Sequence, residues 1–315
     1  MRTGMMTLLA IAAASLSSMG CSSRTLRPSE GFVDVSGGRI WYRIVGGGSG
    51  TPLLLLHGGP GVPSVYLKPL EALADERPVV FYDQLGSGQS NRPKDNSLWT
   101  VQRFVEEVGQ VRKALGLNQI HLYGHSWGSM LAASYMLTRP SGVRSLILAS
   151  APMSIPRYAR DARDLLTTLP AATRTAIETH ERNGSFDSPE YQAAMMEFYK
   201  RYLARRQPWS AEIEKAFAEL NPDVYVYMQG PSEFTITGTI KDYDVTGRLK
   251  DITVPTLFTA GEYDEVRPES VRFYQSLLPG SRLAVIENAA HLTMQDEPER
   301  YVQVLREFLH EAEGR

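Results

Sequence analysis

The chain of 315 residues is 43% hydrophobic and 22% charged, the composition of a globular protein long enough to bury a large core. Its net charge of −2 gives no electrostatic reason to expect nucleic acid as a partner. After the N-terminus no apolar run reaches the roughly 18 residues that a spanning helix needs, so the sequence predicts no membrane-spanning helix there.

The first 21 residues are typical of a secretory signal peptide. Arg2 precedes a small and apolar stretch at residues 5–16, which is too short for a membrane anchor. Cys21, the only cysteine, stands where such a signal ends, and the letters MGC at residues 19–21 resemble a bacterial lipobox. We therefore expect export to the periplasm or cell envelope, with a lipid anchor at Cys21. A plain signal peptide with an incidental cysteine is the alternative.

Residues 31–151 predict the first part of an α/β core, after a polar linker at residues 22–30. A hairpin is expected where apolar and polar residues alternate around two glycines, over residues 32–46. The short apolar runs TPLLLLHGG and PVVFYDQLG are typical of strands buried on both faces of a parallel sheet. Helical spacing over residues 100–115, then the strands QIHLYGHS and RSLILAS with a helix between them, indicate strand–helix alternation.

The pattern changes at residue 152. Residues 152–243 are mainly helical and rich in aromatic side chains, whereas residues 244–315 return to strands and a final helix. A helical block that interrupts an α/β pattern predicts a helical cap inserted into a mostly parallel sheet flanked by helices.

The stretch LYGHSWGSMLAASY contains a G-x-S-x-G motif centred on Ser126, between an apolar strand and a helical run. This context favours a nucleophile elbow, in which a tight strand-to-helix turn exposes the serine hydroxyl. The alternative is a structural turn beside two incidental glycines.

A serine nucleophile needs an imidazole base and a carboxylate that orients it, which in this kind of fold follow in the order Ser, acid, His. His291 lies in a loop after a predicted strand, and we expect it to be the base. His180 and His310 lie on predicted helices and are expected to be solvated. Asp264, at the end of another strand, is the expected acid, with its neighbours Glu262 and Glu265 as rivals.

The oxyanion formed by attack needs two preorganised N–H donors. The amide of Trp127, directly after the nucleophile, is the first candidate. The glycine-rich loop HGGPG at residues 57–61 follows an earlier strand and is expected to supply the second, from Gly59. We expect His57 to pack in this loop rather than to act in catalysis.

Six ordered motifs together resemble the proline iminopeptidase family of α/β-hydrolases, over about residues 32–309. They are HGGPG, FYDQLGSGQS, GHSWG, MQGPSEFTITGTIKDYD, GEYDEVRP and AAHLTMQDEPERY. Residues 229–244 look most like the tricorn-interacting aminopeptidase branch. The resemblance implies an α/β-hydrolase fold in which Ser126, Asp264 and His291 form the triad, with Gly59 and Trp127 as oxyanion donors.

The same resemblance implies that Glu233 and Glu265 hold the free α-amine of the substrate. An α-amine with a pKa near ~8 is mostly cationic at neutral pH, so a carboxylate pair would select it. The alternative for Glu233 is that it caps a turn of the cap. His125 and Leu85 stand where many family members have Gly and Arg, which leaves the preference for proline open.

The sequence therefore predicts a serine aminopeptidase, without cofactor or metal, that releases an N-terminal residue, with proline as one candidate, from short peptides or aminoacyl amides. Tyr225, Tyr227 and Phe234 are candidates to line the side-chain pocket, although core packing is expected of at least one. An esterase, lactonase or amino-acid amidase of the same fold is the enzymatic alternative. A lipid-anchored binding protein without turnover is the non-enzymatic one.

Overall fold

The computed structural model describes residues 26–314. The predicted signal peptide, with the proposed lipidation site Cys21, lies outside the described residues. The first strand begins at Ser29, so the last two residues of the predicted linker, residues 22–30, belong to the sheet.

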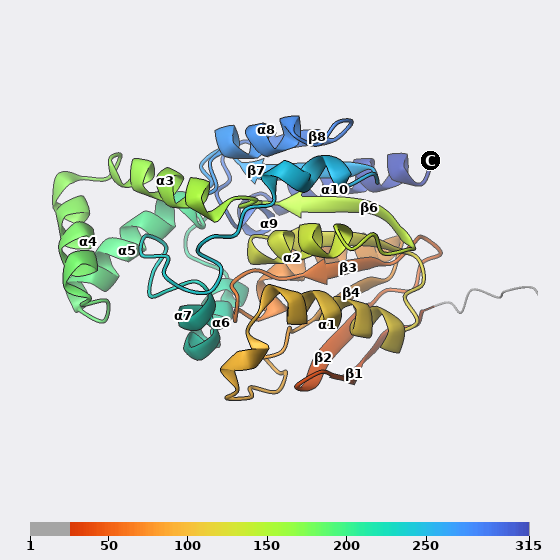
Figure 1. The fold of residues 1–315 in the computed structure, drawn as a ribbon. Coiled ribbons are helices and arrows are strands. Elements are labelled where there is room, and N and C mark those ends of the chain that lie inside the picture. The colour runs from red at the N-terminus through yellow and green to blue at the C-terminus, as the bar shows by residue number, and fades with distance from the viewer. Residues whose placement is uncertain (1–25, 315) are drawn as a thin grey trace, which may run out of the picture.

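One eight-stranded sheet forms the core of the molecule (Figure 1). Its strands are β1 (Ser29–Val35), β2 (Gly38–Val45), β3 (Leu53–Leu56), β4 (Val79–Tyr82), β5 (Ile120–His125), β6 (Val143–Ala149), β7 (Thr256–Gly261) and β8 (Arg282–Ile286). They lie in the order β1-β2-β4-β3-β5-β6-β7-β8. The β1–β2 hairpin is antiparallel to its neighbour β4, and β4 onward is parallel, which confirms the predicted mostly parallel sheet.

Strand β3 shows why these apolar runs become central strands. All four of its leucines are buried, and their side chains alternate between two clusters on opposite faces. Leu54 and Leu56 belong to one cluster, and Leu53 and Leu55 to the other. A strand covered on both faces needs apolar residues at every position, as the sequence predicted for this run.

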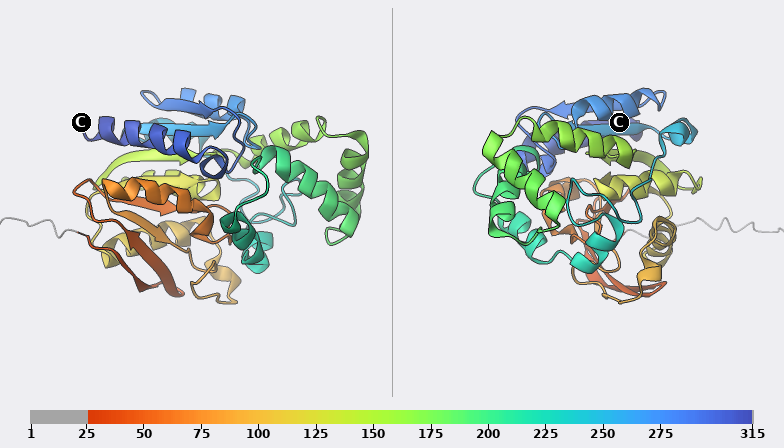
Figure 2. Two further views of the ribbon diagram at one scale, coloured as in Figure 1. Left: turned by 180° about the vertical axis from the view of Figure 1, so that it is seen from behind. Right: turned by 60° about the vertical axis from the view of Figure 1, so that its left-hand side comes forward.

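Helices cover both faces of the sheet and extend beyond one end of it. They are η1 (Ser64–Asp75), η2 (Asn96–Leu98), α1 (Val101–Ala114), α2 (Trp127–Met136), α3 (Ile155–Leu166), α4 (Ala171–Asn183), α5 (Pro189–Tyr202), α6 (Ala211–Ala218), α7 (Pro222–Met228), η3 (Thr246–Asp251), α8 (Pro268–Ser276), α9 (Thr293–Asp296) and α10 (Pro298–Ala312). Helices α1 and α2 lie over the face seen in Figure 1, whereas η1 and α10 cover the face seen from behind in Figure 2. None of the helices in residues 26–314 has both the length and the apolar character needed to cross a bilayer.

Helices α3 to α7 lie between β6 and β7 in the chain, within the segment predicted as a cap, and project beyond the carboxyl ends of the parallel strands (Figures 1 and 2). They have an apolar cluster of their own, in which Phe198 and Phe234 pack edge to face with ring centroids 5.0 Å apart. Serine hydroxyls at Ser188 and Ser210 accept backbone N–H groups at the starts of α5 and α6. These caps satisfy donors that a helix start leaves unpaired.

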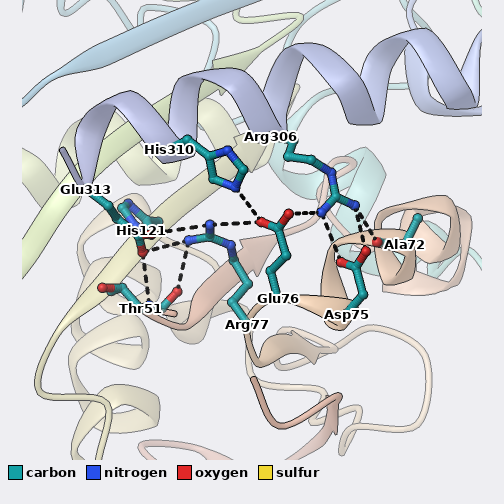
Figure 3. A network of polar contacts seen from close by, with 9 residues as sticks. All are labelled: Thr51, Ala72, Asp75, Glu76, Arg77, His121, Arg306, His310 and Glu313. Carbon is teal, nitrogen blue, oxygen red and sulfur yellow. Dashed lines mark hydrogen bonds and ion pairs between the residues drawn. The ribbon is translucent and has the colours of Figure 1, made fainter. Parts of the chain in front are cut away.

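A network of ion pairs, which we call the basal network, closes the opposite end of the sheet (Figure 3). Glu313, just after α10, accepts from Arg77 at 2.8 Å, from the Thr51 amide at 3.0 Å and from His121 at 3.1 Å. Glu76, at the end of η1, pairs with His310 at 2.7 Å and with Arg306. The network therefore ties the last helix to the amino ends of the central strands.

Candidate active site

Ser126 occupies the turn between the end of β5 and the start of α2. Its backbone has φ 54° and ψ −123°, a conformation that non-glycine residues rarely adopt. A side chain on Gly124 would bring its Cβ within 2.2 Å of the Gly128 carbonyl oxygen, and one on Gly128 within 2.1 Å of the Leu56 oxygen. Only glycine fits at these two positions, where backbone segments approach closely and place Ser126 at the cavity.

His291 and Asp264 meet behind this turn. Asp264 lies in the loop after β7 and His291 in the loop after β8, and His291 Nδ1 donates to Asp264 Oδ1 at 2.8 Å. Both side chains are buried. Since Nδ1 carries the shared proton, Nε2 is the nitrogen left to accept a proton from the nucleophile.

The rival residues lie elsewhere or make other contacts. Glu262 is exposed and accepts the amide of Asn288 at 3.0 Å. His180 bonds to Ser185 within the cap, and His310 belongs to the basal network. Glu265 does approach the imidazole, but at Nε2 rather than Nδ1.

Three histidines near the nucleophile have different electrostatic surroundings. Burial lowers the pKa of His291, but the charges of Asp264 and Glu265 outweigh it and raise that pKa to about 9. Burial also lowers the pKa of His57 and, well below its usual range, that of His125. His291 is therefore the one of the three whose surroundings stabilise a proton taken from the nucleophile.

The loop after β3 presents the second expected oxyanion donor. Gly59 has φ +110°, and it lines the same cavity as Ser126 and Trp127. The adjacent Gly58 amide already donates to Tyr66 Oη at 2.6 Å, which leaves the Gly59 amide as the loop's candidate donor. The Trp127 indole Nε1 donates to Gln84 Oε1 at 2.8 Å, so the backbone amide of Trp127 is its candidate oxyanion donor and the ring N–H is not.

His57 and His125 support this loop and the base. The Gln84 amide donates to His57 Nε2 at 2.9 Å, and His57 Nδ1 donates to the Gly58 carbonyl at 2.9 Å. His125 Nδ1 lies 2.9 Å from Tyr66 Oη, and its Nε2 donates to the backbone oxygen of His291 at 2.9 Å. The residue before the nucleophile thus connects the glycine-rich loop to the backbone of the base. Sequence reasoning recorded His125 only as a departure from the family pattern.

Glu233 and Glu265 face the same cavity from the cap and from the core. Glu233 accepts from Tyr225 Oη at 2.5 Å and from Tyr158 Oη at 2.7 Å. Glu265 is 4% exposed, and its Oε2 atom has no hydrogen-bond partner among the described residues. Burial is the largest cause that raises the pKa of Glu265 to about 8. Tyr158, on α3, was not foreseen because no motif surrounds it.

The cavity has a volume of about 370 Å³ and is lined by residues of the cap and of the loops at the carboxyl ends of the strands. None of the described residues that line it is Lys or Arg, whereas three are acidic: the exposed Asp187 and the glutamates Glu233 and Glu265. Of the three aromatic residues expected to line a pocket, only Tyr225 does. Phe234, which follows α7, instead packs in the core of the cap, and Tyr227, on α7, is 38% exposed.

No group of three or more His, Asp or Glu side chains in the described part of the chain is arranged to hold a metal ion. What the cavity offers a ligand is a largely apolar, aromatic wall that also includes the Glu233 and Glu265 carboxylates, the Ser126 hydroxyl and the His291 imidazole. Such a site can combine nucleophilic attack on a carbonyl with recognition of a nearby cationic group.

Comparisons with known proteins place the chain among proteins of the alpha/beta hydrolase fold. A family model described as the alpha/beta hydrolase fold matches residues 51–298. A proline iminopeptidase of Heyndrickxia coagulans is 46% identical over 285 residues, which cover 90% of this chain and 99% of the relative. The crystal structure of VinJ has a TM-score of 0.88 at 37% identity and covers 91% of this chain and 100% of its own. That of a proline iminopeptidase from Mycobacterium smegmatis has a TM-score of 0.84 at 36% identity, with coverages of 90% and 98%.

Proposed function

Because this chain belongs to the proline iminopeptidase family of α/β-hydrolases, we propose that it is a serine aminopeptidase that releases the N-terminal residue of short peptides or aminoacyl amides. Proline is the first residue to test, since the named relatives are proline iminopeptidases. The closer kinship with the tricorn-interacting branch stays a prediction.

The proposed reaction proceeds through an acyl-enzyme. Ser126 Oγ attacks the carbonyl carbon of the first residue while His291 Nε2 takes the hydroxyl proton, and Asp264 holds the proton on Nδ1. The amides of Gly59 and Trp127 stabilise the oxyanion. His291 then gives its proton to the departing amine. In the second half of the reaction water attacks the acyl carbon while His291 takes its proton, and His291 returns that proton to the departing Ser126 Oγ.

The observation that carries the proposal is the carboxylate pair in a cavity whose lining includes no Lys or Arg among the described residues. A cationic α-ammonium group brings a positive charge to both carboxylates, whereas a blocked N-terminus brings none. Charged hydrogen bonds to a carboxylate are strong, so the pair favours free N-termini. The arrangement also argues against a general esterase, which has no use for two acids at this place.

Replacing Glu233 by Gln tests this assignment. The variant keeps the shape of the side chain but removes a charged hydrogen bond worth about 1.5–3 kcal/mol, so kcat/KM for free aminoacyl-arylamides should fall roughly ten- to more than hundredfold. Hydrolysis of a small aryl ester without an amine should fall far less. The measurements belong below pH 7, where the substrate amine is charged.

Glu181→Gln is the matched control, because Glu181 is a cap carboxylate that also accepts a tyrosine hydroxyl, from Tyr191 at 2.5 Å. It does not line the cavity, so its loss should leave the preference for free amines unchanged. Wild-type enzyme should cleave N-acetylated arylamides poorly. Equal cleavage of free and acetylated arylamides would replace the aminopeptidase assignment by the esterase or amidase one.

We also propose that the protein is exported and anchored to the cell envelope through a lipid on Cys21. The support is the N-terminal pattern alone: a charged residue, an apolar stretch and a cysteine at the end of it. Detergent partitioning and the mass of the mature N-terminus test it. Cys21→Ser should release a soluble form, and a wild-type N-terminus without added lipid mass leaves the plain signal peptide.

A further inference from the structure

Glu265 lies unusually close to the catalytic base. Its Oε1 atom is 3.6 Å from His291 Nε2, the nitrogen that must take the proton from Ser126. The side chains of both residues are at least 95% buried. The carboxylate therefore faces Nε2 of the His291 imidazole.

The backbone holds these two residues in a common frame. The amides of Glu265 and His291 both donate to the carbonyl oxygen of Tyr202, at the end of α5, over 3.2 and 3.1 Å. One acceptor in the cap thus positions the carboxylate and the imidazole together. The backbones that carry the two side chains are therefore held together at the junction between cap and core.

The other groups around the imidazole do not compensate this charge. Asp264 engages Nδ1, and the His125 ring, 4.8 Å away between centroids, is kept neutral by burial. Glu233 adds a second negative charge from the cap, and its two tyrosine partners, on α3 and α7, remain uncharged donors. Asp264, Glu265 and Glu233 thus act on the imidazole, and the described residues that line the cavity include no Lys or Arg. These charges favour retention of a proton on the pair of Glu265 and His291.

We propose that Glu265 couples recognition of the substrate's ammonium group to activation of the base. In the empty site Glu265 pairs with His291 Nε2 and keeps a proton on the pair. A bound ammonium group pairs with the Glu265 carboxylate in place of the imidazole. His291 is then neutral and able to accept the Ser126 proton. The free N-terminus thus acts on the rate of the chemical step as well as on binding. The inference rests on the proposed aminopeptidase function and assigns a regulatory role to one of its two acids.

The proton balance follows from this exchange. Substrate enters as the cation, and one proton leaves the pair of Glu265 and His291 for solvent, so that the net charge of the site is unchanged. Asp264 keeps its hydrogen bond to Nδ1 throughout. No bond to the substrate forms or breaks in this step, and acylation begins from neutral His291 and the Ser126 hydroxyl.

Wild-type enzyme provides the first test, with the 4-nitrophenyl esters of proline and of cyclopentanecarboxylic acid. The two acyl groups differ in the replacement of the ring amine by a methylene. Because the pH dependence of kcat reports groups in the substrate complex, its acid limb for the proline ester should lie about one pH unit or more below that for the other ester. Coinciding limbs would overturn the proposal.

Glu265→Gln provides the second test, on the ester that has no amine. Removing the carboxylate frees His291, so the acid limb of kcat/KM should move down by about one pH unit and activity at pH 7 should rise on the order of tenfold. Hydrolysis of the proline ester should fall, since its ammonium loses a partner. If the carboxylate has only a structural role, the variant should lose activity on both esters in parallel, and the acid limb of kcat/KM should stay in place.

Glu262→Gln is the matched control, because it makes the same change three residues away in the same loop, on an exposed side chain that bonds Asn288. Its profiles should be those of the wild type. Failure of this inference is distinguishable from failure of the proposed function. If Glu233→Gln still loses free-amine substrates selectively while Glu265→Gln leaves the limb in place, amine recognition stands and the coupling is wrong.

Discussion

The two ends of the parallel sheet hold buried charge in opposite ways. At the amino ends of the strands, the carboxylates of the basal network all have cationic partners (Figure 3). Although burial opposes it, His121 and Arg77 lower the pKa of Glu313 to about 2. At the carboxyl ends, one oxygen of Glu265 has no hydrogen-bond partner among residues 26–314, and burial is the largest cause that raises the pKa of this carboxyl to about 8.

This difference separates groups that stabilise the fold from groups kept for a ligand. Carboxylates with a lowered pKa favour the folded state at neutral pH, whereas a buried carboxylate with a raised pKa costs stability as the pH rises. A protein retains such a cost where a function requires it. The basal network should therefore control stability, and the opposite cluster should control activity.

The largest effect is expected from Ser126→Ala, which disables the carboxyl end of the sheet without altering its packing. Removing the nucleophile should lower kcat by at least about 10⁴-fold, leaving only the background that binding and the oxyanion donors provide. Circular dichroism and the urea midpoint should be unchanged. Substantial turnover by the purified variant would place the nucleophile elsewhere.

Arg77→Met makes the complementary change at the amino end. Arg77 is fully buried and bonds Glu313 at 2.8 Å, so its loss leaves a buried carboxylate with fewer partners and should cost about 3 kcal/mol of unfolding free energy. Urea denaturation measures this loss. The kcat/KM of the folded variant at 25 °C should stay within about twofold of wild type, and a large fall would show that the two ends are coupled.

The pH dependence of stability should have opposite signs at the two ends. Burial lowers the pKa of His121 from 6.5 to about 4, so the stability it contributes is complete above pH 6.5 and is lost as the pH falls toward 4. That loss is about 2–3 kcal/mol for one such group. Urea midpoints from pH 7 to 4 measure it, and in His121→Gln their slope should flatten.

The raised pKa values of Glu265 and His291 give the reverse behaviour. Both groups favour the folded state at low pH, and their contribution is lost as the pH rises through about 8 and about 9. For Glu265 that loss lies between about pH 4.5, its unfolded value, and about pH 8, so Glu265→Gln should remove this part of the fall in stability as the pH rises. A variant whose stability falls as steeply as that of the wild type over this range would contradict the assignment of the two ends.

The smallest effect is expected from Tyr158→Phe, which removes one donor to Glu233 at 2.7 Å. Loss of a single hydrogen bond of about 1 kcal/mol should lower kcat/KM for free-amine substrates roughly fivefold. Tyr191→Phe is the control, because the Tyr191 hydroxyl donates to Glu181 instead. Equal losses in the two variants would indicate a general effect on the cap rather than on the amine site.

Several elements could be predicted because their causes are local in the chain. The helix expected over residues 100–115 forms as α1, with Thr100 accepting the amide of Arg103 at its start and Gly116 after its end. The turn at Ser126 also has a local cause, since its two glycines meet backbone atoms that any side chain would strike. Such patterns carry their physical reason within a few residues.

Other features depend on residues far apart in the chain. The contact of Tyr158 with Glu233 spans 75 positions, and that of His125 with the backbone of His291 spans 166. The packing of the cap was equally hidden. Tyr225 lines the cavity and Tyr227, on the same helix, is exposed, whereas Phe234 packs in the core of the cap, the role expected of at least one of the three. Distances of this kind depend on how the cap docks on the core.

The residue order thus specifies the α/β alternation, the position of the inserted helices and the Ser126, Asp264 and His291 side chains, because propensity, glycine sterics and strand ends act locally. Whether both oxygens of a carboxylate find partners is a property of packing. Glu313 and Glu265 are the same residue type, and their side chains are 9% and 5% exposed. Glu313 contacts Arg77 and His121, each more than 190 positions away in the chain, whereas Glu265 lines the cavity. Their opposite pKa shifts arise from desolvation and from neighbours that only the folded chain brings together.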